Sequence, residues 1–199
     1  MVFRIKPAVM VGLLQMERLQ LSKGRQPSET EKNIATAFNQ LENTEAFKAL
    51  KDIKVCGVKE IKIGGETNLI ITVPYKQIEA VKKMSAALVP ELEKKVNKKL
   101  AIVGAHRAFP KSPEKGRRYK AIRPYGRTLR SVNDALLEDL VFPTTIVGKR
   151  IHYDLKGKQA TKVILDENDK TRCEDRLQLF SAAYDRLTGI KAVFEVAQH

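Results

Sequence analysis

The sequence predicts an α+β protein with a mixed, mainly antiparallel sheet. We expect two β-hairpins plus extra strands in the sheet, about four helices packed on it, and one long basic loop. Two observations support this class. Segments with helical spacing of three and four residues alternate along the chain with segments of two-residue strand spacing. Twice, two strand-like segments are joined by a short turn, which is typical of hairpins and favours α+β over a doubly wound parallel sheet.

Length and composition set the broad class of the protein. The chain has 199 residues, of which 43% are hydrophobic, so a core needs no metal or disulfide to support it. We expect a single domain over residues 25–199 and an N-terminal extension over 1–24, with a cleaved targeting segment as the alternative for the extension. The longest apolar run, residues 7–14, is too short to cross a membrane, which takes about 20 residues. Two widely separated cysteines give no disulfide framework and fit a reducing compartment.

The first predicted helix begins near Ser28. Ser28 and Glu31 have the spacing of a capping box, in which each side chain binds the backbone N–H of the other. Apolar residues follow at helical spacing up to Leu41. A further turn is expected from Thr44, with Phe47 and Leu50 on its apolar side.

A hairpin and a second helix come next. Alternating residues from Val58 to Ile63 predict a strand, a Gly-Gly turn follows, and the apolar run 69–73 predicts its partner. The helix is indicated by Ile78, Val81, Ser85, Leu88 and Leu92. Pro90 falls inside it and predicts a kink or a restart, because proline costs about 3 kcal/mol in a helix interior. Residues 100–103 are expected to form a short buried strand.

The C-terminal half repeats this order after a long basic segment. A helix is expected around 129–140, capped by Ser131 or Asp134, although its apolar spacing indicates a slightly earlier start. Ile151, Tyr153 and Leu155 predict the half-buried face of a strand, which turns at 156–157 and pairs with a strand through 163–165. A helix over 175–187 is expected to end at Gly189, and residues 193–196 to form a last strand.

No pattern typical of catalysis is present. The chain lacks a nucleophile elbow, a phosphate loop and metal-ligand spacings, and its three histidines are isolated in the sequence. Glu138 and Asp139 are adjacent on a predicted helix, where neighbouring side chains point in different directions. We therefore expect no enzyme activity, no metal or other cofactor and no small-molecule substrate.

The distribution of charge is the property of this sequence that best indicates its function. The formal net charge is +14, and residues 107–130, here called the basic segment, contain nine basic residues and one acid. This segment also contains prolines and glycines, shows no sustained period, and predicts a long loop over about 107–128. Phe109, Tyr119 and Tyr125 lie among the charges and could stack on unpaired bases. A solvated linker or a nuclear-localisation patch is the alternative interpretation.

The pattern favours RNA over DNA. No predicted helix carries the row of Arg, Asn and Gln that reads a major groove. A basic loop on a folded body suits the crevices of folded RNA, where guanidinium groups bind phosphates and read shape more than sequence.

Longer stretches of the sequence also resemble a known protein family. Residues 134–143, from Asp134 to Pro143, and residues 146–151 closely resemble the eukaryote-specific family-seven proteins of the small (40S) ribosomal subunit. Shorter agreements, such as Leu187-Thr188-Gly189, extend the resemblance over about residues 27 to 199. Residues 1–22 have no counterpart in the family pattern.

The resemblance implies a structural constituent of the cytosolic small subunit that binds 18S-type rRNA and supports assembly and translation. It further implies contacts with neighbouring small-subunit proteins and assembly factors, no membrane contact, and a cytoplasmic location with nucleolar transit. The family's basic loop falls on residues 111–127, and RNA contact extends to Lys149 and Arg150. The expected RNA-binding residues are Arg107, Lys111, Lys115, Arg117, Arg118, Tyr119, Lys120, Arg123, Arg127, Arg130, Lys149 and Arg150.

Two other functions compete with a structural ribosomal protein. A free-standing RNA-binding or ribosome-assembly factor would use the same loop without being stoichiometric with ribosomes. An enzyme acting on RNA would need Glu138, Asp139 and a histidine to converge in one site.

Overall fold

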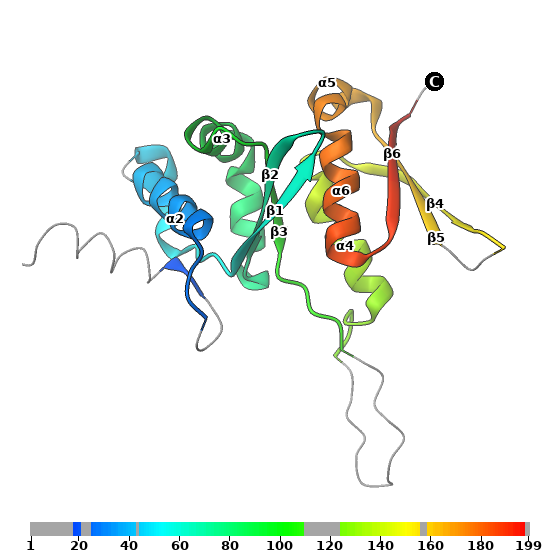
Figure 1. Cartoon of the computed structure of the whole chain (residues 1–199), viewed down its shortest axis with the longest axis horizontal. Coiled ribbons are helices and arrows are strands. Elements are labelled where there is room, and N and C mark those ends of the chain that lie inside the picture. The colour runs from blue at the N-terminus through cyan, green and yellow to red at the C-terminus, as the bar shows by residue number, and fades with distance from the viewer. Residues whose placement is uncertain (1–17, 21–24, 43, 110–123, 156–158, 198–199) are drawn as a thin grey trace, which may run out of the picture. The chain divides into compact units, whose positions relative to one another are not determined.

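The computed structural model describes residues 18–20, 25–42, 44–109, 124–155 and 159–197. The chain divides into two compact units, Met1–Gly104 and Ala105–His199, and each is described by itself (Figure 1). The predicted α+β class is confirmed, and so are both hairpins. The strands lie in two three-stranded sheets, each of which combines one antiparallel and one parallel pair of strands.

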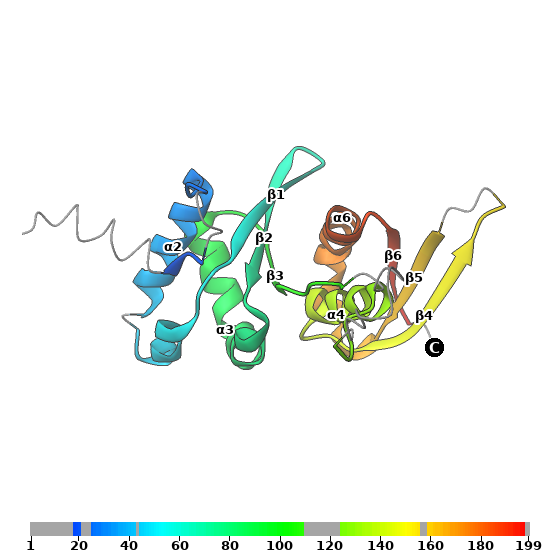
Figure 2. The same cartoon turned by 90° about the horizontal axis from the view of Figure 1, so that it is seen from below.

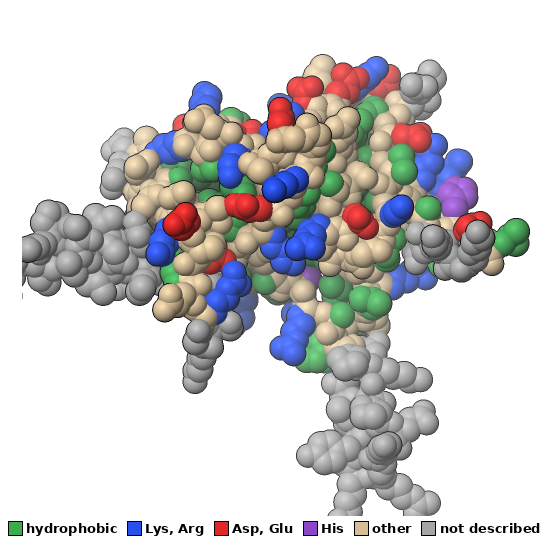
Figure 3. Space-filling model, viewed as in Figure 1, with side chains coloured by type: hydrophobic (Ala, Val, Ile, Leu, Met, Phe, Trp, Pro, Cys, Tyr) green, Lys and Arg blue, Asp and Glu red, His purple; other side chains and the backbone are tan. Residues whose placement is uncertain are grey.

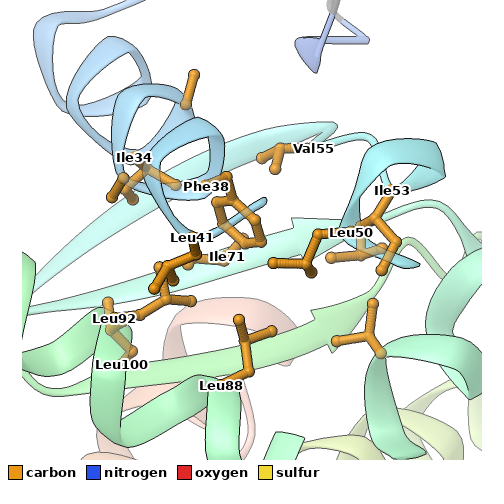
Figure 4. Packing of buried hydrophobic residues seen from close by; sticks show 14 of the residues in the cluster. Ile34, Phe38, Leu41, Leu50, Ile53, Val55, Ile71, Leu88, Leu92 and Leu100 are labelled. Atoms are coloured by element: carbon orange, nitrogen blue, oxygen red, sulfur yellow. The ribbon is translucent and has the colours of Figure 1, made fainter. Parts of the chain in front are cut away.

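Unit 1 packs helices on one side of its sheet. The helical elements are α2 (Glu29–Glu42), the 3₁₀ turns η1 (Glu45–Asp52) and η2 (Tyr75–Gln77), and α3 (Ile78–Val96). The strands are β1 (Gly57–Ile63), β2 (Glu66–Val73) and β3 (Leu100–Gly104), with β2 in the centre, antiparallel to β1 and parallel to β3. Figure 4 shows how Phe38 of α2, Ile71 of β2 and Leu88 of α3 meet in the core. These three side chains are at most 1% exposed.

The start of α2 follows its sequence prediction. The Ser28 N–H donates to Glu31 Oε2 at 2.9 Å, and the Glu31 N–H donates to Ser28 Oγ at 3.3 Å, which completes the capping box. Glu31 Oε1 also accepts from the Val58 N–H of β1 at 3.3 Å and from Arg25 Nη2 at 2.9 Å. The capping residue therefore also joins the helix to the sheet.

Helix α3 does not restart at Pro90, but it is bent, and its two parts run in different directions (Figures 1 and 2). It runs as one helix from Ile78 to Val96, and its buried residues are the five that the sequence spacing predicted. Pro90 and Ala86, whose carbonyl loses its usual partner to the proline, are both exposed. Water can therefore satisfy that carbonyl, which explains why the helix continues. Asn97 ends α3 in the left-handed conformation with φ of 53°.

Unit 2 repeats the hairpin-plus-parallel-strand arrangement. Its strands are β4 (Ile146–Tyr153), β5 (Gln159–Leu165) and β6 (Lys191–Val196), with β5 in the centre, antiparallel to β4 and parallel to β6. Its main helices are α4 (Leu129–Val141) and α6 (Leu177–Thr188). Between β5 and α6 lie η3 (Glu167–Asp169), α5 (Lys170–Cys173) and η4 (Glu174–Arg176). Helix α6 ends at Gly189, with φ of 72°, as predicted.

Two sequence predictions in unit 2 are wrong. Thr128, and not Ser131 or Asp134, caps α4: its side chain accepts from the Ser131 N–H, and the earlier start that the apolar spacing indicated is confirmed. Tyr153 and Leu155 do not face the core, since they are 72% and 105% exposed. The reason is that the β4–β5 hairpin extends beyond the helices that cover the sheet (Figure 2). The turn predicted at 156–157 lies outside the described residues.

Within the described part of the chain, no helix combines the length and the apolar character needed to cross a membrane.

Candidate nucleic-acid interface

The structure describes both ends of the basic segment, residues 107–109 and 124–130. The predicted RNA-binding residues with a described position are therefore Arg107, Arg127 and Arg130, together with Lys149 and Arg150 on β4. The predicted residues outside the described part are Lys111, Lys115, Arg117, Arg118, Tyr119, Lys120 and Arg123.

The two ends of the basic segment lie side by side. The Phe109 N–H donates to the Arg127 carbonyl at 3.0 Å, so residues 109 and 127 lie next to each other. The second end contains a turn at Tyr125-Gly126, where φ of 70° at Gly126 favours glycine. Residues 107–109 and 124–130 are here called the base of the segment. A backbone hydrogen bond closes this base, and such a bond does not depend on side-chain type.

Helix α4 holds both ends of this base. His106, directly before the segment, places Nε2 2.7 Å from Oδ2 of Asp139 in α4, and the two side chains are 8% and 4% exposed. After the segment, Thr128 caps the same helix and accepts from the Ser131 N–H at 3.3 Å. A buried contact before the segment and a helix cap after it fix the positions of the two ends of the segment on α4.

Charged and aromatic side chains are exposed at this base. Arg107 and Arg130 are exposed, and the Tyr125 ring is fully exposed at 104%. The guanidinium of Arg107 lies over the Phe109 ring, 5.8 Å from its centroid, in a cation–π contact. Phe109 is 40% exposed, so part of its side chain is accessible to a nucleic acid.

An open depression of about 340 Å³ lies beside the base on α4. It is lined by Arg130 but also by the carboxylates Asp134 and Glu138. Two acids against one arginine make this depression a poor site for phosphate. The positive potential therefore belongs to the basic segment and not to the depression.

Lys149 and Arg150 point to opposite sides of their sheet. Lys149 lies opposite buried Val163 on the side that the helices cover, and its ammonium pairs with Asp134 of α4. Arg150 lies opposite Lys162 on the other side and is exposed. The sequence treated the two as one basic pair, but strand alternation places them on opposite sides of the sheet, and both are exposed.

The convergent site that an RNA-cleaving enzyme would need is absent among the residues described. Asp139 is buried against His106, while its neighbour Glu138 is exposed on α4. No group of three or more His, Cys, Asp or Glu in the described part of the chain is placed to hold a metal ion. Burial raises the pKa of Cys56 and of Tyr184 and lowers the pKa of Arg18, and none of these three residues lies in the basic segment.

Sequence reasoning missed the anchoring role of His106, which it took as an isolated residue. No local pattern could have indicated it, because Asp139 is 33 positions away. The closure of the base by Phe109 and Arg127 was missed for the same reason, since backbone pairing across a loop leaves no mark on residue type.

Known proteins of one family match most of the chain. The sequence model of the family described as ribosomal protein S7e matches residues 18–196. The small ribosomal subunit protein eS7 of Drosophila yakuba is 42% identical over 175 residues, which cover 86% of this chain and 90% of that protein. Small ribosomal subunit protein eS7z of Arabidopsis thaliana is 41% identical over 181 residues, covering 89% and 94%. The eS7 protein of Dictyostelium discoideum is 38% identical over 178 residues, covering 88% and 92%.

A family match of this length and relatives at this identity leave one conclusion: the chain belongs to the ribosomal protein S7e family, whose members are structural, non-enzymatic ribosomal proteins.

Proposed function

We propose that the protein is a structural constituent of the small subunit of the cytosolic ribosome and binds small-subunit rRNA mainly through the basic segment. The observation that carries the RNA-binding part is the charge of this segment, nine basic residues against one acid, on a base that is closed and anchored to α4. Membership of the ribosomal protein S7e family supports the ribosomal part.

The pairing of the two ends reduces the conformational entropy that the segment loses when it binds RNA. A loop whose ends are already paired starts with its closure entropy removed, so less of the binding free energy is used in ordering it. Arg107 and Arg130 then extend the positive surface from the segment onto the body. Arginines there can bind two phosphate oxygens at once. Tyr125 and the accessible part of Phe109 offer stacking surfaces for unpaired bases.

Further parts of the proposal follow from the family. We infer contacts with neighbouring small-subunit proteins and with assembly factors, and a support role in subunit assembly and translation. The protein would then act in the cytoplasm after passing through the nucleolus, where subunits assemble.

A sucrose gradient of cell extract separates this function from that of a free-standing RNA-binding or assembly factor. A structural constituent should co-migrate with small subunits and polysomes in a constant ratio to rRNA, and should stay bound at moderate salt. Presence only in precursor fractions, or loss from polysomes at modest salt, would instead indicate an accessory or assembly factor.

A pair of variants tests the role of the basic segment. In the loop variant, Arg117, Arg118 and Lys120 become Gln; in the control variant, Lys51, Lys59 and Lys62, all exposed in unit 1, become Gln. Both lose three charges. The plot of log K against log salt falls with salt, and the steepness of this fall is here called the salt slope. The loop variant should lower the salt slope for rRNA by about two to three, since each neutralised phosphate contributes about 0.7–0.9. Equal slopes for the two variants would rule out the segment as the main contact.

A further inference from the structure

The sheet of unit 2 has one covered side and one open side. Helices α4 and α6 lie on the same side of the sheet (Figure 2). Thr161, Val163 and Leu165 of β5 and Ala192 and Phe194 of β6 face these helices and are at most 5% exposed. The alternating residues of each strand face away from the helices.

The side away from the helices, here called the open face, carries mostly positive charge. The strand pairing places Arg150 of β4 directly opposite Lys162 of β5, and Lys162 level with Val193 of β6. Lys191 of β6 lies level with Ala160, two residues from Lys162 along the sheet. The open face comprises Gly148, Arg150, His152, Ala160, Lys162, Ile164, Lys191, Val193 and Glu195. Figure 3 shows Lys, Arg and His side chains gathered over the β4–β5 hairpin.

This arrangement is unfavourable for the isolated protein. Like charges directly opposite each other on neighbouring strands repel, because their Cβ atoms are only about 5 Å apart. Arg150 and Lys162 form such a pair. Glu195 is the single acid of the open face, and it pairs with Lys162 at 2.7 Å between Nζ and Oε2. Arg150 and Lys191 are exposed and have no ion-pair partner within the described ranges.

The open face is also hollowed. A depression of about 600 Å³ is lined by Arg150, Lys162, Ile164 and Glu195 of the open face, by Lys170 and Glu174, and by the apolar residues Leu177, Phe194, Val196 and Ala197. Three basic side chains thus border one continuous hollow. The acids beside it, Glu195 and Glu174, make ion pairs with Lys162 and Lys170, and all four side chains of these pairs are at least 38% exposed. Exposed pairs of this kind are worth at most about 1 kcal/mol, so a stronger anion can replace the carboxylates.

We propose that the open face is a second RNA contact surface, which binds the sugar-phosphate backbone of rRNA independently of the basic segment. This inference rests on the proposed function, since it takes rRNA as the partner. Neighbouring strands are about 4.8 Å apart and alternate residues along a strand about 6.6 Å apart, so Arg150, Lys162 and Lys191 present a row of cations to successive phosphates.

The chemistry of the open face favours RNA backbone over bases or a protein partner. Apart from His152 it contains no aromatic ring on which a base could stack, and it contains no Asn or Gln that could read a base edge. Its apolar residues, Ile164 and Val193, are too few and too scattered among charges for the core of a protein interface, which is poor in charged residues. Phosphate relieves the repulsion between Arg150 and Lys162, whereas an apolar partner would bury it.

Three variants of the full-length chain test this proposal, with small-subunit rRNA and two RNA duplexes of unrelated sequence as probes. In the face variant, Arg150, Lys162 and Lys191 become Gln, which removes as many charges as the loop and control variants do. The face variant should lower the salt slope by about two to three relative to the control variant, and equally on both duplexes. Lys149→Gln, on the opposite side of the same strand, removes one charge outside the open face and should change the slope by no more than about 0.9.

The variant Glu195→Gln changes binding in the opposite direction. Removing the only acid of the open face should tighten RNA binding by about two- to fivefold, the size expected for one exposed charge. Partial unfolding would weaken binding, so tightening cannot result from it. A Glu195→Gln variant that binds no better, or a face variant that behaves like the control variant, would overturn the proposal. A loss of binding on one duplex only would overturn backbone recognition.

The loop variant tells the two proposals apart. If it lowers the salt slope while the face variant does not, the proposed function stands and the second surface is rejected. If neither variant differs from the control variant, both are rejected. If the face variant alone lowers the slope, the open face is supported and the basic segment is not the main contact.

Discussion

Glu31 is a carboxylate with no exposed surface that joins three parts of unit 1. One oxygen accepts the Ser28 N–H at the start of α2, and the other accepts from Arg25 and from the Val58 N–H of β1. Buried charges are stable in proteins only when they are paired and hydrogen-bonded, as this one is. The capping residue that the sequence indicated is therefore also the link between α2 and the sheet, which the sequence did not indicate.

Replacing Glu31 by Ala should reduce the free energy of unfolding by about 2–3 kcal/mol. The substitution removes a helix cap and leaves the buried Val58 N–H without its acceptor. Urea unfolding measures the change, with Glu29→Ala as the control, because Glu29 is in the same first turn but exposed. The control should stay within about 0.5 kcal/mol of the unaltered protein. A loss below 1 kcal/mol in Glu31→Ala would show that the link to β1 adds no stability.

Tyr184 makes the free energy of unfolding depend on pH in the alkaline range. Burial raises the pKa of its phenol, hydrogen bonding with Thr188 opposes this, and the negative charge of Asp134 adds to it. The unfolded chain releases the phenolic proton first, at its ordinary pKa of about 10. The contribution of Tyr184 is thus fully present below about pH 10 and is lost as the pH rises from there towards the pKa of the folded state.

The variant Tyr184→Phe should therefore lose less stability than the unaltered protein between about pH 9 and about pH 11. Urea unfolding at both pH values gives the difference. Tyr75→Phe, at a ring that is 52% exposed, is the control and should lose as much as the unaltered protein. Equal losses in all three proteins would contradict a role of Tyr184 in the alkaline transition.

Helix α3 is the element in which local chemistry and tertiary packing conflict. Pro90 lies inside it, yet the helix is continuous because Leu88 and Leu92 on either side are fully buried. The free energy of burying these two side chains, about 1.5–3 kcal/mol each, offsets the cost of the proline. The proline ring itself is on the exposed side.

Replacing Pro90 by Ala should stabilise the protein by about 1–3 kcal/mol, because it restores a helical hydrogen bond and removes a steric clash. Part of this gain is lost to the larger entropy of the unfolded chain. The urea midpoint should rise, whereas Lys94→Ala at an exposed position of α3 should leave it nearly unchanged. A lower midpoint in Pro90→Ala would mean that the proline fits a distortion on which α3 depends.

The elements show what the sequence could and could not predict. Periodicity predicted the buried side of α3 correctly, because a helix in contact with a core shows its apolar side in every turn. The same reasoning failed for Tyr153 and Leu155, whose alternation is that of a half-buried strand. Whether a strand is covered depends on how far the neighbouring helices reach, and residue spacing carries no information about that distance.

The same limit applies to the candidate sites. The basic segment was predictable because its charge density is a property of consecutive residues. The open face was not, because Arg150, Lys162 and Lys191 come from three strands and meet only through the strand pairing. The sequence also grouped Lys149 with Arg150, although Lys149 pairs with Asp134 on the covered side.

At the scale of the whole molecule, charge is distributed very unevenly. Of the net charge of +14, the 24 residues of the basic segment contribute +8, and the other 175 residues contribute +6. Concentrated like charge keeps the free protein soluble but repels itself, which destabilises the compact state. Under the proposed function, rRNA phosphates would neutralise this charge and remove the cost. The free protein has only dissolved salt to do so.

Salt should therefore stabilise the free protein. Raising KCl from 0.05 M to 0.5 M shortens the screening length from above 10 Å to a few ångströms. A gain of about 1 kcal/mol corresponds to a rise in Tm of about 2–4 °C for a chain of this size. In the loop variant, which has three fewer positive charges in the basic segment, the rise should be smaller than in the control variant, because the repulsion is concentrated there. Equal rises in Tm in the two variants would mean that the repulsion is spread over the whole protein. The repulsion would then not be concentrated in the basic segment.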